Sequence, residues 1–124
     1  MAKILVVDDS SLSRKISRRF LEEAGHMVDD AADGLSALER YALARPDLVL
    51  LDVTMNEMDG LEVLRQLRTM DPDARVVMAT ADAQTSTRTL SEAGGAVGFV
   101  LKPLVPGPVL RAVDAALAPQ GGTA

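Results

Sequence analysis

Acidic side chains stand directly after two short hydrophobic runs of this 124-residue chain. Asp8 and Asp9 follow the first run, and Asp52 follows a later one. Thr80 and Lys102 stand in the same position after two further runs. Carboxylates held close together repel one another, and a divalent cation offsets that repulsion. Because this set offers oxygen ligands without nitrogen or sulfur, Mg²⁺ is the favoured cation.

Three carboxylates, a hydroxyl and an ammonium group suit phosphoryl transfer. In that chemistry a metal ion and a lysine neutralise the phosphoryl oxygens, and a carboxylate can act as the nucleophile. Each residue also has a plainer interpretation, because an Asp after a strand often caps a helix or turn and Thr80 could satisfy local backbone groups. Their joint occurrence after four hydrophobic runs favours the chemical interpretation.

Composition excludes several classes of protein. Hydrophobic residues make up 48% of the chain and aromatic residues 2%, so the core must be aliphatic. The chain has no cysteine and one histidine, which excludes thiol chemistry and disfavours a histidine-based zinc site or a serine hydrolase triad. The net charge of −5 disfavours sequence-independent nucleic-acid binding. Without a signal peptide or a membrane-length hydrophobic stretch, we expect a soluble, cytoplasmic protein with no membrane partner.

Hydrophobic periodicity predicts alternating strands and helices. In the first helix the predicted packing stripe is Leu12, Ile16, Phe20 and Ala24, and Gly25 is the expected left-handed cap. The expected strands are Lys3–Val7, Met27–Ala31, Leu48–Leu51, Val76–Ala79 and Val97–Leu101.

Three further helices follow from the same spacing. The second is capped by Asp33-Gly34 and stops before Pro46, the third ends at Asp71-Pro72, and the last begins near Pro108. A fourth helix within Asp82–Gly95 is expected to be short or mobile, because its threonines disfavour helix. The expected packing positions are Leu35, Leu38 and Ala42, then Leu61, Leu64 and Leu67, then Val109, Val113 and Leu117.

Five such units, joined by right-handed crossovers, predict an α/β fold. The expected architecture is a doubly wound, five-stranded parallel sheet with helices on both faces, of flavodoxin-like topology. We expect one domain over residues 1–118 and a flexible C-terminal tail over residues 119–124. Ligands of such sheets bind outside the carboxyl ends of the strands, where the polar residues named above are expected to meet.

From Lys3 to about Leu117 the chain resembles the receiver domain of bacterial two-component response regulators. Phe99 stands three residues before the lysine, as the switch aromatic of that family does. In place of the proline usual after the loop methionine, Asn56 follows Met55. The matching motifs are Ile4-Leu5-Val6-Val7-Asp8-Asp9, Leu50-Leu51-Asp52, Met58-Asp59-Gly60, Ala79-Thr80-Ala81 and Lys102-Pro103.

The resemblance implies a role for each site residue. Asp52 is the expected phosphoacceptor, and the bound ion is expected to be Mg²⁺, for which Mn²⁺ can substitute. Asp82 could orient an attacking water, so an especially long-lived phosphoryl group is not expected. The implied sets are Asp8 (partly through water), Asp9, Asp52 and the carbonyl of Thr54 for the metal; Thr80, Ala81 and Lys102 for the phosphoryl group; Thr80 and Phe99 for the switch; Pro103 for a cis peptide bond; and Thr54 and Asp82 for tuning dephosphorylation.

The resemblance also implies a function. We expect a stand-alone response regulator, similar to chemotaxis regulators, that is phosphorylated by a sensor histidine kinase or a histidine phosphotransfer protein. It would signal to a protein target through its fourth helix, fifth strand and last helix, as a monomer or a phosphorylation-dependent dimer. It is expected to be a signalling phosphoacceptor that assists its own phosphorylation and dephosphorylation, and not an enzyme.

Several alternatives stay open from the sequence. Within the family, the alternative is a phosphorelay intermediate that passes the phosphoryl group to a histidine phosphotransfer protein. A magnesium-dependent aspartyl-phosphate phosphohydrolase is more remote, because Asp52-Val53-Thr54 lacks its usual Asp-x-Asp pair. A flavin-binding domain would need a phosphate-binding loop and stacking aromatics, and the sequence offers neither. The basic residues Arg14, Lys15, Arg18 and Arg19 form either a docking face for the phosphodonor or a solvated helix face.

Overall fold

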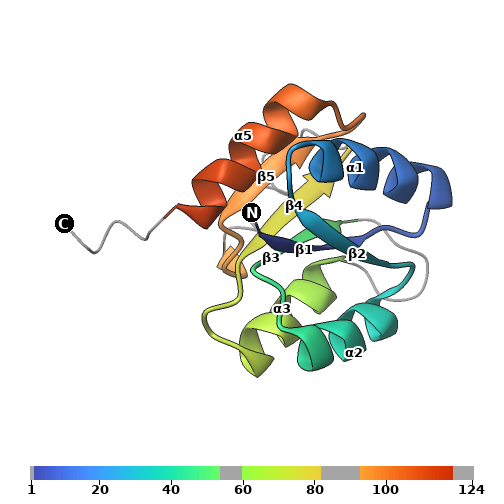
Figure 1. The fold of residues 1–124 in the computed structure, drawn as a ribbon. Coiled ribbons are helices and arrows are strands. Elements are labelled where there is room, and N and C mark those ends of the chain that lie inside the picture. The colour runs from blue at the N-terminus through green and yellow to red at the C-terminus, as the bar shows by residue number, and fades with distance from the viewer. Residues whose placement is uncertain (1, 54–59, 82–92, 119–124) are drawn as a thin grey trace.

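The computed structural model describes residues 2–53, 60–81 and 93–118. Strands and helices alternate along these ranges, and the strands have nearly the predicted bounds (Figure 1). The last helix begins at Pro106, two residues before the predicted start. Most of the predicted fourth helix lies outside the described residues. The elements are β1 (Lys3–Val7), α1 (Ser11–Glu23), β2 (Met27–Ala31), α2 (Gly34–Ala44), β3 (Leu48–Asp52), α3 (Gly60–Met70), β4 (Val76–Thr80), β5 (Gly98–Leu101) and α5 (Pro106–Leu117).

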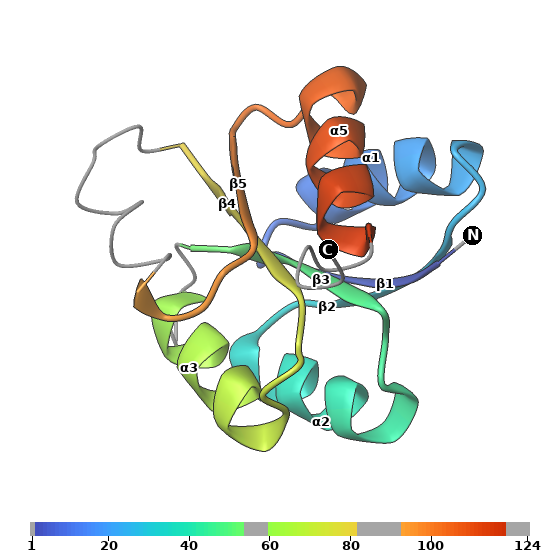
Figure 2. The same cartoon turned by 90° about the vertical axis from the view of Figure 1, so that its left-hand side faces the viewer.

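The strands form one parallel sheet in the order β2-β1-β3-β4-β5. Helices α1 and α5 cover one face and α2 and α3 cover the other (Figures 1 and 2). The doubly wound fold predicted from the sequence is therefore confirmed. Register aligns the strand ends, since Val7 pairs with Leu51, Asp52 with Ala79, and Thr80 with Leu101.

One mainly aliphatic core lies on each side of the sheet. Successive residues of a strand point to opposite faces, so Leu5 and Val7 join the α2–α3 side while Ile4 and Val6 join the α1–α5 side. Strand β3 is buried along its whole length. Burial on both faces explains why the strand sequences are continuous hydrophobic runs.

The predicted packing stripe of α1 is wrong. Leu12 is 66% and Ile16 47% exposed, and Ala24 is also exposed, whereas Phe20 is buried. A helix turns by about 100° per residue, so a four-residue repeat drifts by about 40° at each step. The face that packs on the sheet follows three- and four-residue steps instead. It consists of Ser17, Phe20 and Leu21.

Helix α2 also differs from its predicted stripe, but here the predicted spacing of three and four residues is correct and the buried face is shifted by one residue. Leu35 is 65% exposed and Ala42 is exposed, while Leu38 is partly buried against the core. Its buried face is Gly34, Ala37 and Tyr41. Helices α3 and α5 agree better with prediction, because Leu64, Leu67, Val109 and Val113 are buried.

The predicted helix boundaries have a clear local cause. Asp33 caps α2 by accepting a 2.8 Å hydrogen bond from the Ser36 N–H. Gly25 follows α1 with a φ of 98°, as the cap prediction required. Arg45 ends α2 in the left-handed region with a φ of 46°, which the sequence did not indicate.

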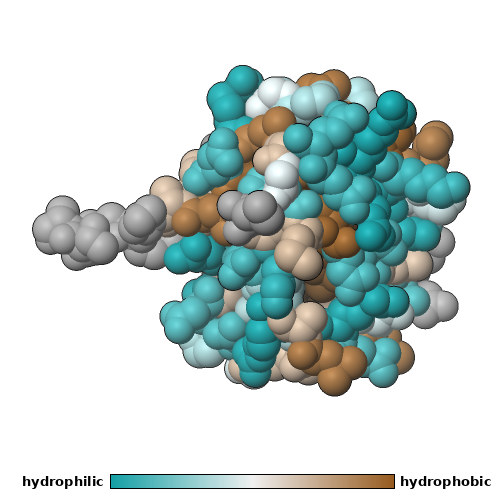
Figure 3. All heavy atoms as spheres, in the orientation of Figure 1, coloured by the Kyte–Doolittle hydropathy of each residue, from teal (hydrophilic) through white to brown (hydrophobic). Residues whose placement is uncertain are grey.

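Hydrophilic residues dominate the side of the molecule that carries α1 and β2 (Figure 3). Within the described ranges, no helix combines the length and apolar composition that crossing a bilayer requires.

Candidate functional site

The carboxyl ends of four strands bring the predicted site residues to one edge of the sheet. Asp8 follows β1, Asp52 ends β3, Thr80 ends β4 and Lys102 follows β5. Asp8, Asp52 and Thr80 are buried, with exposed fractions of 4%, 5% and 2%. Asp9 is exposed. The parallel strands therefore bring together residues that are far apart in the sequence. These are the residues that were predicted to meet at the carboxyl ends of the strands.

Asp8, Asp9 and Asp52 form a cluster of three carboxylates. Each contributes one oxygen, and these oxygens all lie within 4.8 Å of one another. Two of the three carboxylates are withdrawn from water, which makes their mutual repulsion costly. An all-oxygen set of this charge fits Mg²⁺, which binds protein sites through a few carboxylates and keeps several waters. The residues present therefore fit the ion that the family implies.

Lys102 supplies positive charge to this cluster. Its Nζ lies 2.9 Å from Asp8 Oδ2 and 3.3 Å from Asp52 Oδ2. Burial lowers the pKa of Lys102, but the hydrogen bond to Asp8 and the charges of Asp52 and Asp8 outweigh burial and raise that pKa overall. The Lys102 N–H donates to the Thr80 carbonyl, at 2.7 Å, and the Lys102-Pro103 peptide bond is cis, as expected.

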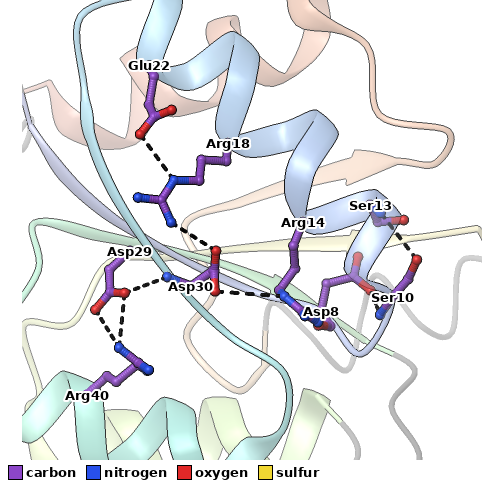
Figure 4. Close-up of polar contacts among 9 residues, drawn as sticks. All are labelled: Asp8, Ser10, Ser13, Arg14, Arg18, Glu22, Asp29, Asp30 and Arg40. Atoms are coloured by element: carbon purple, nitrogen blue, oxygen red, sulfur yellow. Dashed lines mark hydrogen bonds and ion pairs between the residues drawn. The ribbon is translucent and has the colours of Figure 1, made fainter.

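The turn after β1 is fixed by hydrogen bonds on both sides of Asp8 (Figure 4). The Asp8 N–H continues the sheet ladder by donating to the Ala31 carbonyl at 3.1 Å. Its Oδ1 accepts from the Ser10 N–H at 2.9 Å, and its carbonyl oxygen accepts from Arg14 Nη1 at 2.6 Å. Ser10 then caps α1 by accepting from the Ser13 N–H. Asp8 is therefore held in place before any ligand binds.

Gly60 allows α3 to begin against the end of β3, the strand that carries Asp52. A Cβ atom at this position would overlap the carbonyl oxygen of Asp52 and lie 2.6 Å from Val53 Cα. The Gly60 N–H donates to the Val53 carbonyl at 2.7 Å. The glycine of the Met58-Asp59-Gly60 motif therefore has a steric role at the site, which the sequence pattern alone did not state.

The expected switch residues lie on β4 and β5. Phe99 is partly buried and packs against the α2–α3 core, and its strand neighbour is Met78. Ala81, an expected phosphoryl contact, is exposed just beyond Thr80. Thr54, Asp82 and the Met55-Asn56 departure lie outside the described residues, so the roles expected there stay predictions.

Most of the basic cluster on α1 is engaged within the molecule. Arg18 Nη1 lies 3.1 Å from Asp30 Oδ2, and Arg18 Nε lies 3.1 Å from Glu22 Oε2. Arg19 pairs with Glu23 at 3.6 Å. Arg14 and Asp30 were not recognised as a pair from the sequence, because their contact joins a helix to a separate strand. No signal in a single sequence could have found it.

Known proteins share this fold and resemble this sequence along most of its length. The sequence matches the family described as "Response regulator receiver domain" over residues 4–114. Protein CcdB of Bacillus subtilis is 42% identical over 115 residues, which cover 92% of this chain and 96% of that protein. Chemotaxis protein CheY of Listeria monocytogenes is 38% identical over 117 residues, which cover 94% of this chain and 98% of that protein.

A solved structure gives the same result. One chain of the CheX-CheY-BeF3-Mg²⁺ complex from Borrelia burgdorferi is 32% identical to this chain, with a TM-score of 0.90, covering 94% of this chain and 90% of that one. This chain therefore belongs to the response regulator receiver domain family. Receiver domains are signalling phosphoacceptors, and this is the general role of the chain.

Proposed function

We propose that this chain accepts a phosphoryl group on Asp52 from a sensor histidine kinase or a histidine phosphotransfer protein. The observation that carries the proposal is the position of the Lys102 ammonium group, which contacts both Asp52 and Asp8. A lysine held between two buried carboxylates is placed to neutralise the oxygens of a phosphoryl group on Asp52. Residues 1–118 would form the phosphoaccepting unit.

The transfer step balances as a displacement at phosphorus. A carboxylate oxygen of Asp52 forms the new P–O bond while the P–N bond of the donor phosphohistidine breaks, and the electron pair of that bond stays on the imidazole nitrogen. Lys102 holds its positive charge beside the incoming oxygens, and the Thr80 hydroxyl donates a hydrogen bond to one of them. A bound Mg²⁺, held by Asp8, Asp9, Asp52 and the Thr54 carbonyl, would neutralise further negative charge on the phosphoryl group.

The proposed output is a protein contact on the face of β5 and α5, together with residues 82–95. Phosphorylation would draw Thr80 toward the new oxygens, and Phe99 would move into the space that Thr80 leaves. Exposed apolar side chains around β5 support a partner surface there, since Val97, Leu101 and Val105 are 42%, 50% and 47% exposed. The CheX-CheY complex among the similar structures supports a protein partner.

Intact-mass measurement after treatment with acetyl phosphate and Mg²⁺ tests the proposal. We expect the wild-type chain to gain the mass of one phosphoryl group and Asp52→Asn to gain none. Asp114→Asn is the matched control, because it removes an exposed carboxylate from α5 and should be phosphorylated as wild type is. An adduct of equal yield on Asp52→Asn would contradict the assignment of Asp52.

A further inference from the structure

One arginine of α1 holds the acidic turn after β1 (Figure 4). Arg14 Nη1 donates a 2.6 Å hydrogen bond to the carbonyl oxygen of Asp8. Its Nε lies 3.8 Å from Asp30 Oδ1 on β2, and the Arg14 side chain is only 18% exposed. A guanidinium between a carbonyl and a carboxylate makes charge-assisted contacts that are partly sheltered from water. Arg14 therefore connects the turn to the second strand of the sheet.

The contact restrains Asp9 more than it restrains Asp8. The Asp8 carbonyl and the Asp9 N–H belong to one planar peptide unit, so a bond to that carbonyl fixes the orientation of the unit. Asp8 has independent restraints from Ser10 and Lys102 on its carboxylate. Asp9 is exposed, and its carboxylate has no hydrogen bond or ion pair to any other residue that the structure describes. The direction in which the Asp9 side chain projects is therefore determined largely by the orientation of the Asp8–Asp9 peptide plane, which the hydrogen bond from Arg14 fixes.

We propose that Arg14 is a positioning residue for divalent-cation binding, because it orients the Asp8–Asp9 peptide so that the Asp9 carboxylate meets the ion together with Asp8 and Asp52. The inference rests on the proposed function, which requires an ion at this cluster. Two effects of Arg14 on cation affinity have opposite signs. The positive charge of Arg14 repels a cation, whereas its hydrogen bond to the Asp8 carbonyl orients the Asp9 carboxylate for binding the ion. Removal of Arg14 should therefore weaken cation binding if positioning dominates and strengthen it if charge dominates.

Calorimetric titration of the apo chain with Mg²⁺ separates these effects. The test variant is Arg14→Met, and Arg18→Met is the matched control. The Arg18→Met substitution removes the same charge from the same helix and also removes a contact to Asp30. Arg18 differs from Arg14 because it makes no contact with Asp8 among the described residues. We expect Arg14→Met to raise the Mg²⁺ dissociation constant about tenfold, the lower end of the range for residues that orient metal ligands. Arg18→Met should leave it within about twofold of wild type, since an exposed charge is screened.

Unfolding of the apo proteins in urea shows whether each variant is folded during the titration. If Arg14→Met does not fold, Arg14→Lys is the test variant instead. Lysine keeps the positive charge but lacks the planar guanidinium that contacts both the Asp8 carbonyl and the Asp30 carboxylate. Weaker Mg²⁺ binding by the Arg14 variant than by Arg18→Met supports the proposal. Equal or tighter binding overturns it. Failure of the wild-type chain to bind Mg²⁺ would instead contradict the proposed function, so the two failures are distinguishable.

Discussion

Gly60 shows how one missing side chain shapes the site. The first turn of α3 passes so close to β3 that the backbone of Asp52 and Val53 occupies the space of a Cβ atom. Backbone atoms cannot rotate away as a flexible side chain can, so any larger residue must displace either the helix or the strand that carries Asp52.

We predict that Gly60→Ala lowers the free energy of unfolding by about 1–3 kcal/mol, the usual cost of overpacking. It should also slow phosphorylation by acetyl phosphate, because Asp52 is displaced. Gly107→Ala is the control, since its nearest contact would be a side-chain atom of Arg111 at 3.5 Å and alanine favours helix. Urea unfolding and intact mass measure the two effects. Equal stability of Gly60→Ala and wild type would show that the helix accommodates the methyl group.

At the scale of single residues, the sequence predicted which residues lie at the candidate site better than it predicted which side chains contact one another. Asp8, Asp52, Thr80 and Lys102 were assigned correctly to one edge, because register in a parallel sheet makes strand ends coincide. The hydrogen bond from Arg14 to the Asp8 carbonyl was not predicted, because it depends on how α1 sits above the turn. Side-chain contacts between elements require the packing geometry, which residue spacing does not contain.

A polar cluster of Tyr41, Arg45 and Asp71 connects helix α2 to the turn after α3. The Tyr41 hydroxyl donates a 2.6 Å hydrogen bond to Asp71 Oδ2, and Arg45 Nη1 lies 3.3 Å from the same oxygen. The Arg45 guanidinium also lies over the Tyr41 ring, 5.6 Å from its centroid. Burial and the hydrogen bond to Asp71 raise the pKa of Tyr41 to about 12. The hydrogen bond from Tyr41 is the main reason that the pKa of Asp71 is lowered.

These shifts predict how stability depends on pH. Because the folded state disfavours tyrosinate, the contribution of Tyr41 is fully present below its ordinary pKa of 10.0 and is lost as the pH rises toward about 12. Tyr41→Phe should lower the free energy of unfolding at neutral pH by about 1–2 kcal/mol, through loss of a hydrogen bond to a charged group. The difference between wild type and Tyr41→Phe should shrink above pH 10.0.

Tyrosinate absorbance gives a direct measurement, because Tyr41 is the only tyrosine and the chain has no tryptophan. Asp71→Asn is the informative partner variant, since loss of the carboxylate should move the Tyr41 titration back toward pH 10.0. A wild-type Tyr41 titration centred at pH 10.0 would contradict the proposed effect of burial and of the Asp71 hydrogen bond on Tyr41.

At the scale of elements, the sequence predicted the existence of helices but not their buried faces. Leu12 and Leu35 were assigned to packing stripes, yet both are mostly exposed, while Ser17 and Ala37 are buried. On both helices the small residue is buried beside large ones, Phe20 and Leu21 on α1 and Tyr41 on α2. Which small residue faces the sheet depends on helix rotation, and an irregular hydrophobic pattern does not determine that rotation.

The whole molecule carries a net charge of −5, and part of this charge is concentrated at the carboxylate cluster. We predict that Mg²⁺ stabilises the fold, by about 2.7 kcal/mol at a free concentration one hundred times the dissociation constant. Asp9→Asn should abolish this gain. Without Mg²⁺ the same variant should be at least as stable as wild type, because it removes a repelling charge from an exposed position.

Urea unfolding with and without Mg²⁺ measures both effects, and Asp114→Asn, which removes an exposed carboxylate from α5, should respond to Mg²⁺ as wild type does. Equal Mg²⁺ stabilisation of Asp9→Asn and wild type would exclude Asp9 as a ligand. A large loss of stability in the metal-free variant would mean that Asp9 has a structural role.

The strand order has a consequence for synthesis on the ribosome. After β1 and β2, each strand is added at the same growing edge of the sheet, from β3 to β4 to β5. The nascent chain can therefore build its sheet in the order in which it is translated, with no strand held back for a later partner. Asp8, Asp9 and Asp52 emerge early, whereas the neutralising Lys102 follows the last strand. In that order of assembly, Lys102 balances the acidic cluster only when β5 docks.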